Sequence, residues 1–241
     1  MRFLMLGAVL AAMSAAQTLD ELAARAKSHE EARQHAKAVE VYTQILKMRP
    51  DLTTMYNRRG YERFKMGEIE GALADFDKAI ALEPAGMPYH WQRGITLYYA
   101  GRYEEGVRQF DAHQKVNGND VENAAWRYLC MARSRSVEKA RAALIPIEGD
   151  PRVPMAEIHS LFAGKGSVEQ VLAAVSAGNP AARERDQRMF YADLYIALYH
   201  EAAGRGSEAA KHMKRAAAYS ADNYMADVAR VHAARLTRGT R

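Results

Sequence analysis

Residues 53–84 read TTMYNRRGYERFKMGEIEGALADFDKAIALEP, and this stretch decides the fold. Small residues stand where two packed helices would nearly touch, with Gly60 on the first helix and Ala72 on the second. Phe76 fills the space beside them, as a large side chain does where helix surfaces interdigitate. Gly67 supplies the turn, because glycine readily adopts the left-handed conformation that ends a helix. The stretch therefore predicts a helical hairpin that is closed by its final proline.

The same residue types recur along the chain at a fixed interval. The small column is Ala38, Ala72, Gly106 and Ala140, the large apolar column is Tyr42, Phe76, Phe110 and Leu144, and the breaker column is Pro50, Pro84 and Gly118. A period of about 34 residues with this pattern is typical of tetratricopeptide (TPR) arrays. Helical hairpins stack in such arrays because none can bury its apolar face alone. The sequence therefore predicts an all-α fold, a TPR-type helical-hairpin solenoid.

The pattern predicts about five repeats, three regular and two degenerate, with a capping helix at the carboxyl end. We divide the chain into a signal peptide over residues 1–16, a regular TPR array over 17–145, a Pro-rich connection over 146–154, and degenerate TPR-like hairpins with the closing helix over 155–241. The three prolines of the connection interrupt any helix there.

The degenerate part of the chain, residues 155–241, is predicted to be helical. We expect short helices over 155–163 and 168–175, a full-length hairpin over 187–220, and a closing helix over 222–236. Ser167 with Gln170 forms a capping box, and Asp222 caps the closing helix. The charged run 183–188 is predicted as a solvated loop or helix entry.

The amino terminus has the layout of a secretory signal peptide. Arg2 precedes an apolar run from Phe3 to Ala12, and small residues follow up to Ala16. The run would span about 15 Å as a helix, half of the hydrocarbon thickness, so no stable membrane anchor is expected. We expect export, with the protein periplasmic or extracellular after cleavage near Ala16. The alternative keeps this segment as an amino-terminal helix of a cytoplasmic TPR interaction protein.

Composition favours a globular scaffold over several other classes. The chain has 241 residues, 49% of them hydrophobic, and a formal net charge of +5. Acidic and basic residues alternate rather than forming one basic stripe, so we expect no nucleic-acid binding. The single cysteine, Cys130, stands in an apolar setting and is predicted to be a core residue.

Motifs for catalysis, metal or cofactor binding are missing at the spacings that such sites need. His29-Glu30 lacks a second histidine at position 33, and Gly204 stands where the partner of His200-Glu201 would be. The Gly164–Ser167 segment lacks the earlier glycine of a phosphate-binding loop. We therefore expect a non-enzyme with no catalytic residue, no metal site and no cofactor.

The first helices of TPR hairpins line a concave groove in which peptides dock. Extending the repeat register, we expect a protein or peptide partner to contact Asn57, Tyr61, Lys65, Trp91 and Tyr98. Tyrosine and tryptophan are frequent binding anchors. Trp91 could equally pack in the core between hairpins. Phe64 is expected to be a core residue. The basic residues of the middle repeats favour an acidic segment or an anionic polymer as the ligand. The alternative is that they lie on ordinary solvated helix faces.

A second function remains open from the residues. The repeat rule is broken over 146–180, and local departures from a fold's rules often mark function. An enzyme or ligand-binding domain built on this segment would show converging histidines or carboxylates.

Two stretches resemble a particular family of TPR proteins. Trp91 to Arg102 reads WQRGITLYYAGR, and Asn119 to Leu129 reads NDVENAAWRYL. They resemble the new-lipoprotein-I family of bacterial envelope adaptors. The resemblance implies an all-helical, often homodimeric adaptor that holds peptidoglycan-cutting enzymes and presents clients to a periplasmic protease. Gln17 stands where a lipoprotein of this family needs cysteine, so lipid attachment is not expected here.

Overall fold

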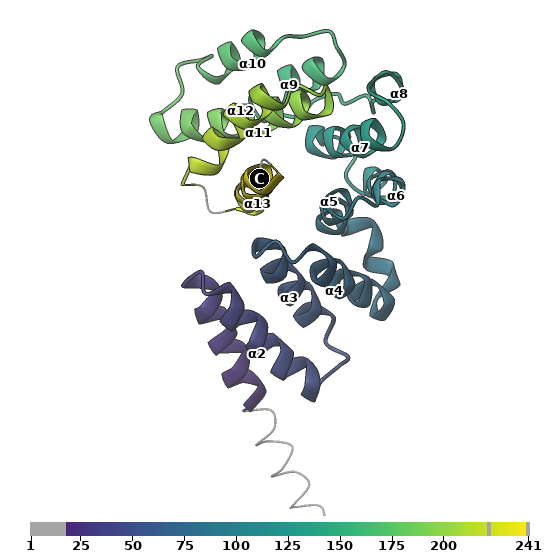
Figure 1. Cartoon of the computed structure of the whole chain (residues 1–241), viewed down its shortest axis with the longest axis vertical. Helices are drawn as coiled ribbons and strands as arrows, with labels where there is room; N and C mark the ends of the chain where they lie inside the picture. The colour runs from purple at the N-terminus through teal and green to yellow at the C-terminus, as the bar shows by residue number, and fades with distance from the viewer. Residues whose placement is uncertain (1–17, 221–222, 240–241) are drawn as a thin grey trace, which may run out of the picture. The chain divides into compact units, whose positions relative to one another are not determined.

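The computed structural model describes residues 18–220 and 223–239. Every regular element within these residues is a helix, so the all-α prediction is confirmed (Figure 1). The chain forms two compact units that divide after Pro84, and each is described by itself. The expected signal peptide and the expected cap Asp222 lie outside the described residues.

The first unit contains two helical hairpins. A helix over residues 18–31 pairs with α2 (His35–Met48), and α3 (Thr53–Lys65) pairs with α4 (Ile69–Leu82). α3 packs against both α2 and α4. The repeating columns of the sequence form the core: the buried members in this unit are Ala38, Tyr42, Ala72 and Phe76. Phe64 is also fully buried, which confirms its prediction as a core residue.

The recurring small and large residues of the hairpins have a direct packing cause. A Cβ atom added to Gly60 would lie 2.8 Å from Cε1 of Phe76. One added to Gly94 would lie 2.6 Å from Cζ of Phe110, the equivalent pair in the next hairpin. Real Cβ atoms essentially never come this close to another heavy atom. Each aromatic ring therefore occupies the volume that a side chain at the glycine would need.

The turn of each regular hairpin uses a left-handed residue after the first helix. Gly67 and Gly101 have φ of 77° and 74°, as glycine allows. In the first hairpin Arg33 takes this role with φ of 54°. Its backbone N–H donates to the Glu30 carbonyl and the Gln34 N–H to that of His29, so the turn is closed as in the other hairpins. The arginine keeps the geometry at a cost in backbone strain.

The second unit continues the helical hairpins after a 3-10 turn at Pro84–Tyr89. Its helices are α5 (Trp91–Tyr99), α6 (Tyr103–Gln114), α7 (Val121–Ser134), α8 (Val137–Ala142), α9 (Met155–Phe162), α10 (Val168–Val175), α11 (Ala182–Ala202), α12 (Gly206–Ala218) and α13 (Tyr224–Gly239). Residues 144–151 carry no regular structure. Ser167 and Gln170 make the predicted capping box at the start of α10. Cys130 is buried, as predicted.

α11 is longer and more central than the sequence pattern indicates. It begins at Ala182, so the charged run 183–188 is its first part and not a loop. It packs against α7 and α9 as well as against α10 and α12. Residues 192–198 are buried without interruption, so this part of α11 is enclosed on all sides.

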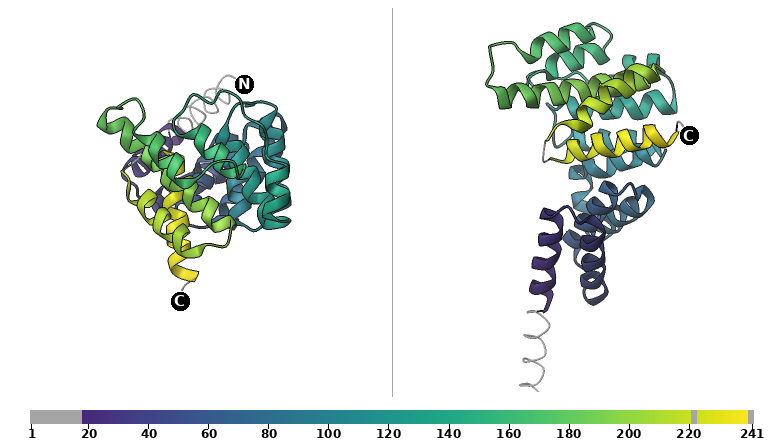
Figure 2. Two further views of the ribbon diagram at one scale, coloured as in Figure 1. Left: turned by 90° about the horizontal axis from the view of Figure 1, so that it is seen from above. Right: turned by 60° about the vertical axis from the view of Figure 1, so that its left-hand side comes forward.

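α13, the closing helix, packs on α12 and reaches α5. Figure 1 shows it end-on beside α5 and below α11 and α12, and Figure 2 shows it running alongside that pair. The Tyr224 ring lies edge-on to Trp91 with centroids 4.8 Å apart. Nδ1 of His232 lies 3.0 Å from the Tyr99 hydroxyl. The side chain of Asn223 accepts from the Ala226 N–H at 2.9 Å and so caps this helix.

Candidate binding surface

The first unit carries three of the five predicted contact residues. Asn57, Tyr61 and Lys65 lie on α3 at intervals of four, so they share one face of that helix. All three are partly buried. The Lys65 ammonium lies 3.9 Å from the centroid of the Tyr61 ring, in cation–π geometry.

Lys65 also serves the interior of the first unit. Its ammonium donates to Oε1 of Glu62 at 2.6 Å, and Nδ1 of His35 lies 2.6 Å from Oε2 of the same carboxylate. Glu62 is fully buried. A buried carboxylate is costly unless it is paired and hydrogen-bonded, so Lys65 has a structural role beside any role in binding.

The second unit carries the other two, Trp91 and Tyr98, on α5. Trp91 is partly exposed. Tyr98 is 6% exposed, and its hydroxyl donates to Oε2 of Glu201 on α11 at 3.0 Å. The predicted contact set is thus divided between the two units, and its use as one site stays a prediction. Within the second unit, helices from the end of the chain cover the aromatic face of α5.

One cavity beside α5 gathers tyrosines around a Glu–His pair. It measures about 140 Å³ and is lined by Tyr98, Tyr99, Tyr103, Arg133, Glu201, His232, Arg235 and Leu236. Burial raises the pKa of Tyr98 and of Tyr99 well above their ordinary value. Burial also lowers the pKa of His232. These groups are therefore neutral hydrogen-bonding partners that fix α13 and α11 against α5.

A larger cavity, called here the Trp91 cavity, opens at the other end of α5. It measures about 260 Å³ and is lined by Trp91, Ile95, Phe110, His113, Asn117, Asp120, Glu122, Asn123, Trp126, Arg152 and Met225. Its lining combines aromatic and aliphatic side chains with buried polar ones such as Asn123, and Asn117 and Arg152 are exposed. Both tryptophans of the chain line it. A recess in which polar groups converge beside aromatic side chains is typical of a binding pocket.

Carboxylates surround the Arg152 guanidinium at this cavity. Arg152 pairs with Asp120 and Asp150 at 2.6 Å each and also with Glu122. Burial raises the pKa of Glu122, against the opposing effects of Tyr195 and Arg152. Burial also acts to raise the pKa of Asp150, but hydrogen bonds from Arg152 and from backbone N–H groups outweigh it and lower that pKa. The cluster is charged, and the α7 amino terminus lies within it.

The irregular segment 146–180 shows no such convergence around its own recess. A cavity of about 530 Å³ at α9 and α10 is lined by Ala156, Glu157, Ser160, Lys165, Gln170, Ala173, Ala174 and Ala177. Asp150 and Arg152 of the segment turn instead toward α7. Within residues 18–220 and 223–239 no group of histidine, cysteine, aspartate and glutamate is placed to hold a metal ion.

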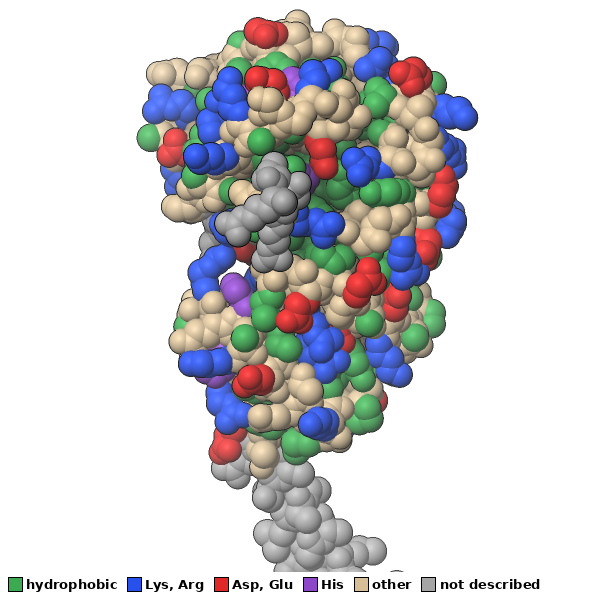
Figure 3. All heavy atoms as spheres, viewed as in Figure 1, with side chains coloured by type: hydrophobic (Ala, Val, Ile, Leu, Met, Phe, Trp, Pro, Cys, Tyr) green, Lys and Arg blue, Asp and Glu red, His purple; other side chains and the backbone are tan. Residues whose placement is uncertain are grey.

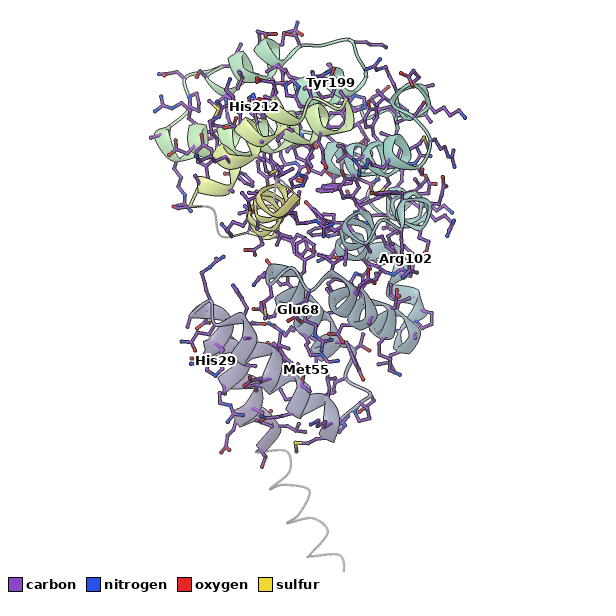
Figure 4. All side chains as sticks on the ribbon, viewed as in Figure 1. His29, Met55, Glu68, Arg102, Tyr199 and His212 are labelled. Atoms are coloured by element: carbon purple, nitrogen blue, oxygen red, sulfur yellow. The ribbon has the colours of Figure 1, made fainter. Side chains whose placement is uncertain are left out.

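A buried histidine–carboxylate pair joins α11 and α12. Figure 4 labels His212 on α12. Its Nδ1 lies 2.7 Å from Oδ1 of Asp193, and the Arg215 guanidinium donates to the same oxygen at 2.7 Å. Both His212 and Asp193 are buried. The pair therefore acts as a polar link in the helix interface rather than as an open acid–base site.

Sequence reasoning missed the residues of α11, α13 and the loop before α9 that complete both cavities. Tyr224, His232 and Glu201 meet α5 from more than 100 residues away in the chain. The repeat register relates only neighbouring hairpins, so it carries no signal for these contacts. Trp126 stands in the apolar run that contains Cys130, and its spacing gives a core position but not the cavity beside it.

No protein-family model matches the chain. Similar solved structures include TTC0263, a thermophilic TPR protein of Thermus thermophilus, with 16% identity, a TM-score of 0.46 and coverage of 91% of this chain and 99% of that one. PilW, a type IV pilus biogenesis factor, has 14% identity and a TM-score of 0.49, and the match covers 88% of this chain and 98% of that one. The TPR domain of P58(IPK) has 12% identity and a TM-score of 0.44, and the match covers 93% of this chain and 67% of that one. At these identities and TM-scores, the likenesses carry no argument about partners.

Lysine and arginine side chains are interspersed with aspartate and glutamate on the face shown in Figure 3. None of the described helices is both long and apolar enough to cross a bilayer.

Proposed function

We propose that this chain is a TPR scaffold that holds a protein or peptide partner at the Trp91 cavity beside α5. The observation that carries the proposal is the Trp91 cavity, where an aromatic anchor residue and charged edge groups meet in one recess. Such recesses accept the few side chains that supply most of the binding free energy of an interface. Helical hairpin repeats present such a surface on rigid elements.

The proposal includes export to the cell envelope. Its support is the signal-like pattern of residues 1–16 and the resemblance of residues 91–102 and 119–129 to envelope adaptors. A link to cell-wall enzymes or to proteolysis rests on that resemblance. Amino-terminal sequencing of the mature protein tests export: Gln17 is the expected first residue, and an intact Met1 would favour the cytoplasmic alternative.

Capture of partners from envelope extract tests the binding face. We expect Trp91→Ala to weaken capture at least about tenfold, the loss of a typical anchor, without unfolding the chain. Tyr89→Ala is the matched control because Tyr89 precedes α5 and is 64% exposed outside both cavities. Equal capture by the Trp91 variant and the control, with both folded by circular dichroism, would contradict the proposed face.

A further inference from the structure

The Trp91 cavity contains hydrogen-bonding groups that the described residues leave unsatisfied. Oδ1 of Asn123 and Nε1 of Trp126 are buried and have no hydrogen-bond partner within the described part of the chain. Asn123 is 3% exposed and Trp126 is 1% exposed, and both side chains line the cavity. An unsatisfied buried polar group is unfavourable, so its presence in a recess points to a ligand that satisfies it.

The charge at the cavity favours a cation. Three carboxylates, those of Asp120, Glu122 and Asp150, face the one guanidinium of Arg152. The cluster is therefore net negative, in a chain whose formal net charge is +5. The remaining titratable wall residue, His113, has Nδ1 2.9 Å from the Pro88 carbonyl oxygen. A positive group entering here would meet carboxylate oxygens as well as the free acceptor of Asn123.

The aromatic part of the cavity wall favours a ligand with an aliphatic chain, and the cavity volume excludes a large ligand. Trp91, Phe110 and Trp126 present aromatic rings, beside which an ammonium is attracted and a methylene chain is covered. The volume of about 260 Å³ lies below that of pockets for whole cofactors, which begin at about 300 Å³. The unsatisfied indole N–H needs an acceptor, which a peptide carbonyl provides.

We propose that the Trp91 cavity binds the side chain of a lysine exposed on the partner protein, with the ammonium at Asp120, Glu122 and Asn123. This rests on the proposed function, and it names the chemistry that the partner presents to α5. The compact ammonium donates in three directions and fits beside Arg152, which already makes the paired contacts typical of a guanidinium.

Intrinsic fluorescence of the full chain tests this directly, because both tryptophans line the cavity. The probes are acetyl-Gly-Lys-Gly-amide, the same peptide with arginine, and the same peptide with norleucine, which lacks the ammonium. We expect the lysine peptide to give a saturable fluorescence change at lower concentrations than either other peptide. Equal or tighter binding of the norleucine or arginine peptide, or no saturable change with lysine, would overturn the assignment.

Charge-neutral variants locate the ammonium. Asp120→Asn keeps a good helix cap, because asparagine caps as well as aspartate, and removes only the charge. We expect Asp120→Asn to weaken lysine-peptide binding about tenfold, because a charge-assisted hydrogen bond is lost. Glu122→Gln should weaken binding to the same extent. Glu104→Gln is the control, since Glu104 is paired with Arg135 away from the cavity. Unchanged binding in both cavity variants would overturn the proposal.

The same variants separate this inference from the proposed function. If Asp120→Asn captures the partner as well as the unmodified chain does while Trp91→Ala fails, the lysine assignment is wrong and the scaffold surface stands. If capture is insensitive to Trp91→Ala, the proposed face fails, and peptide fluorescence still decides what the cavity binds.

Discussion

Gly94 and Phe110 show at the scale of single residues why the hairpins repeat as they do. The ring occupies the volume beside the glycine, and the pair Gly60 and Phe76 does the same in the first unit. Both partners of each pair lie within one hairpin, so their spacing was readable from the sequence. The left-handed turn at Arg33 has no glycine to mark it, because the residue type alone does not reveal which backbone conformation the fold imposes.

Replacing Gly94 by alanine should destabilise the second unit. The added methyl group would lie 2.6 Å from the Phe110 ring, so either the ring or the backbone must move. We expect a loss of about 1–3 kcal/mol in the free energy of unfolding, measured by urea denaturation.

Gly86→Ala is the control, because a Cβ there meets nothing within 4 Å. Combining Gly94→Ala with Phe110→Leu should show a coupling free energy between the two sites. Additive effects of the two changes, or no loss with Gly94→Ala alone, would contradict the packing account.

At the scale of elements, the start of α11 and the contacts of α13 differ most from what the sequence indicates. The periodicity of α13 predicts a closing helix, and that prediction is confirmed. Its contact with α5 depends on Tyr224 and His232, whose partners are Trp91 and Tyr99. Periodicity reports which face of a helix is apolar but not which distant element it meets. The charged start of α11 was ambiguous because arginine and glutamate suit a helix surface as well as a loop.

Acid should weaken the attachment of α13. Burial lowers the pKa of His232 below its ordinary value of 6.5, and burial with the Arg205 charge does the same for His200. Below about pH 6.5, these histidines therefore bind protons more readily in the unfolded chain than in the folded chain. The stabilisation is present above about pH 6.5 and is lost as the pH falls toward the folded pKa.

Urea unfolding at about pH 7 and pH 5.5 measures this effect. We expect a lower free energy of unfolding at the acid pH, and a smaller difference in His232→Gln. His29→Gln, which changes a partly exposed histidine of the first unit, should leave the difference as it is. An unchanged pH dependence in the His232 variant would show that this imidazole is not the group responsible.

At the scale of the whole chain, the class of fold was predictable and the candidate binding surface only in part. Columns such as Ala38 to Ala140 encode hairpins because helix packing repeats locally. The register also placed Trp91 on a face with a recess, while it gave no sign that Tyr98 is bonded to Glu201. The Arg152 cluster is assembled from two loops and a helix start, and such assemblies have no periodic signal.

The central claim is that partners bind at Trp91, and site-specific photo-crosslinking tests it most directly. A benzophenone amino acid is placed at position 91 in one full-length variant and at position 89 in another, and each is irradiated in envelope extract. We predict a discrete protein adduct from position 91, attached near a lysine of the partner, and none from position 89. Adducts of equal yield from both positions, or an adduct from position 89 alone, would contradict the claim.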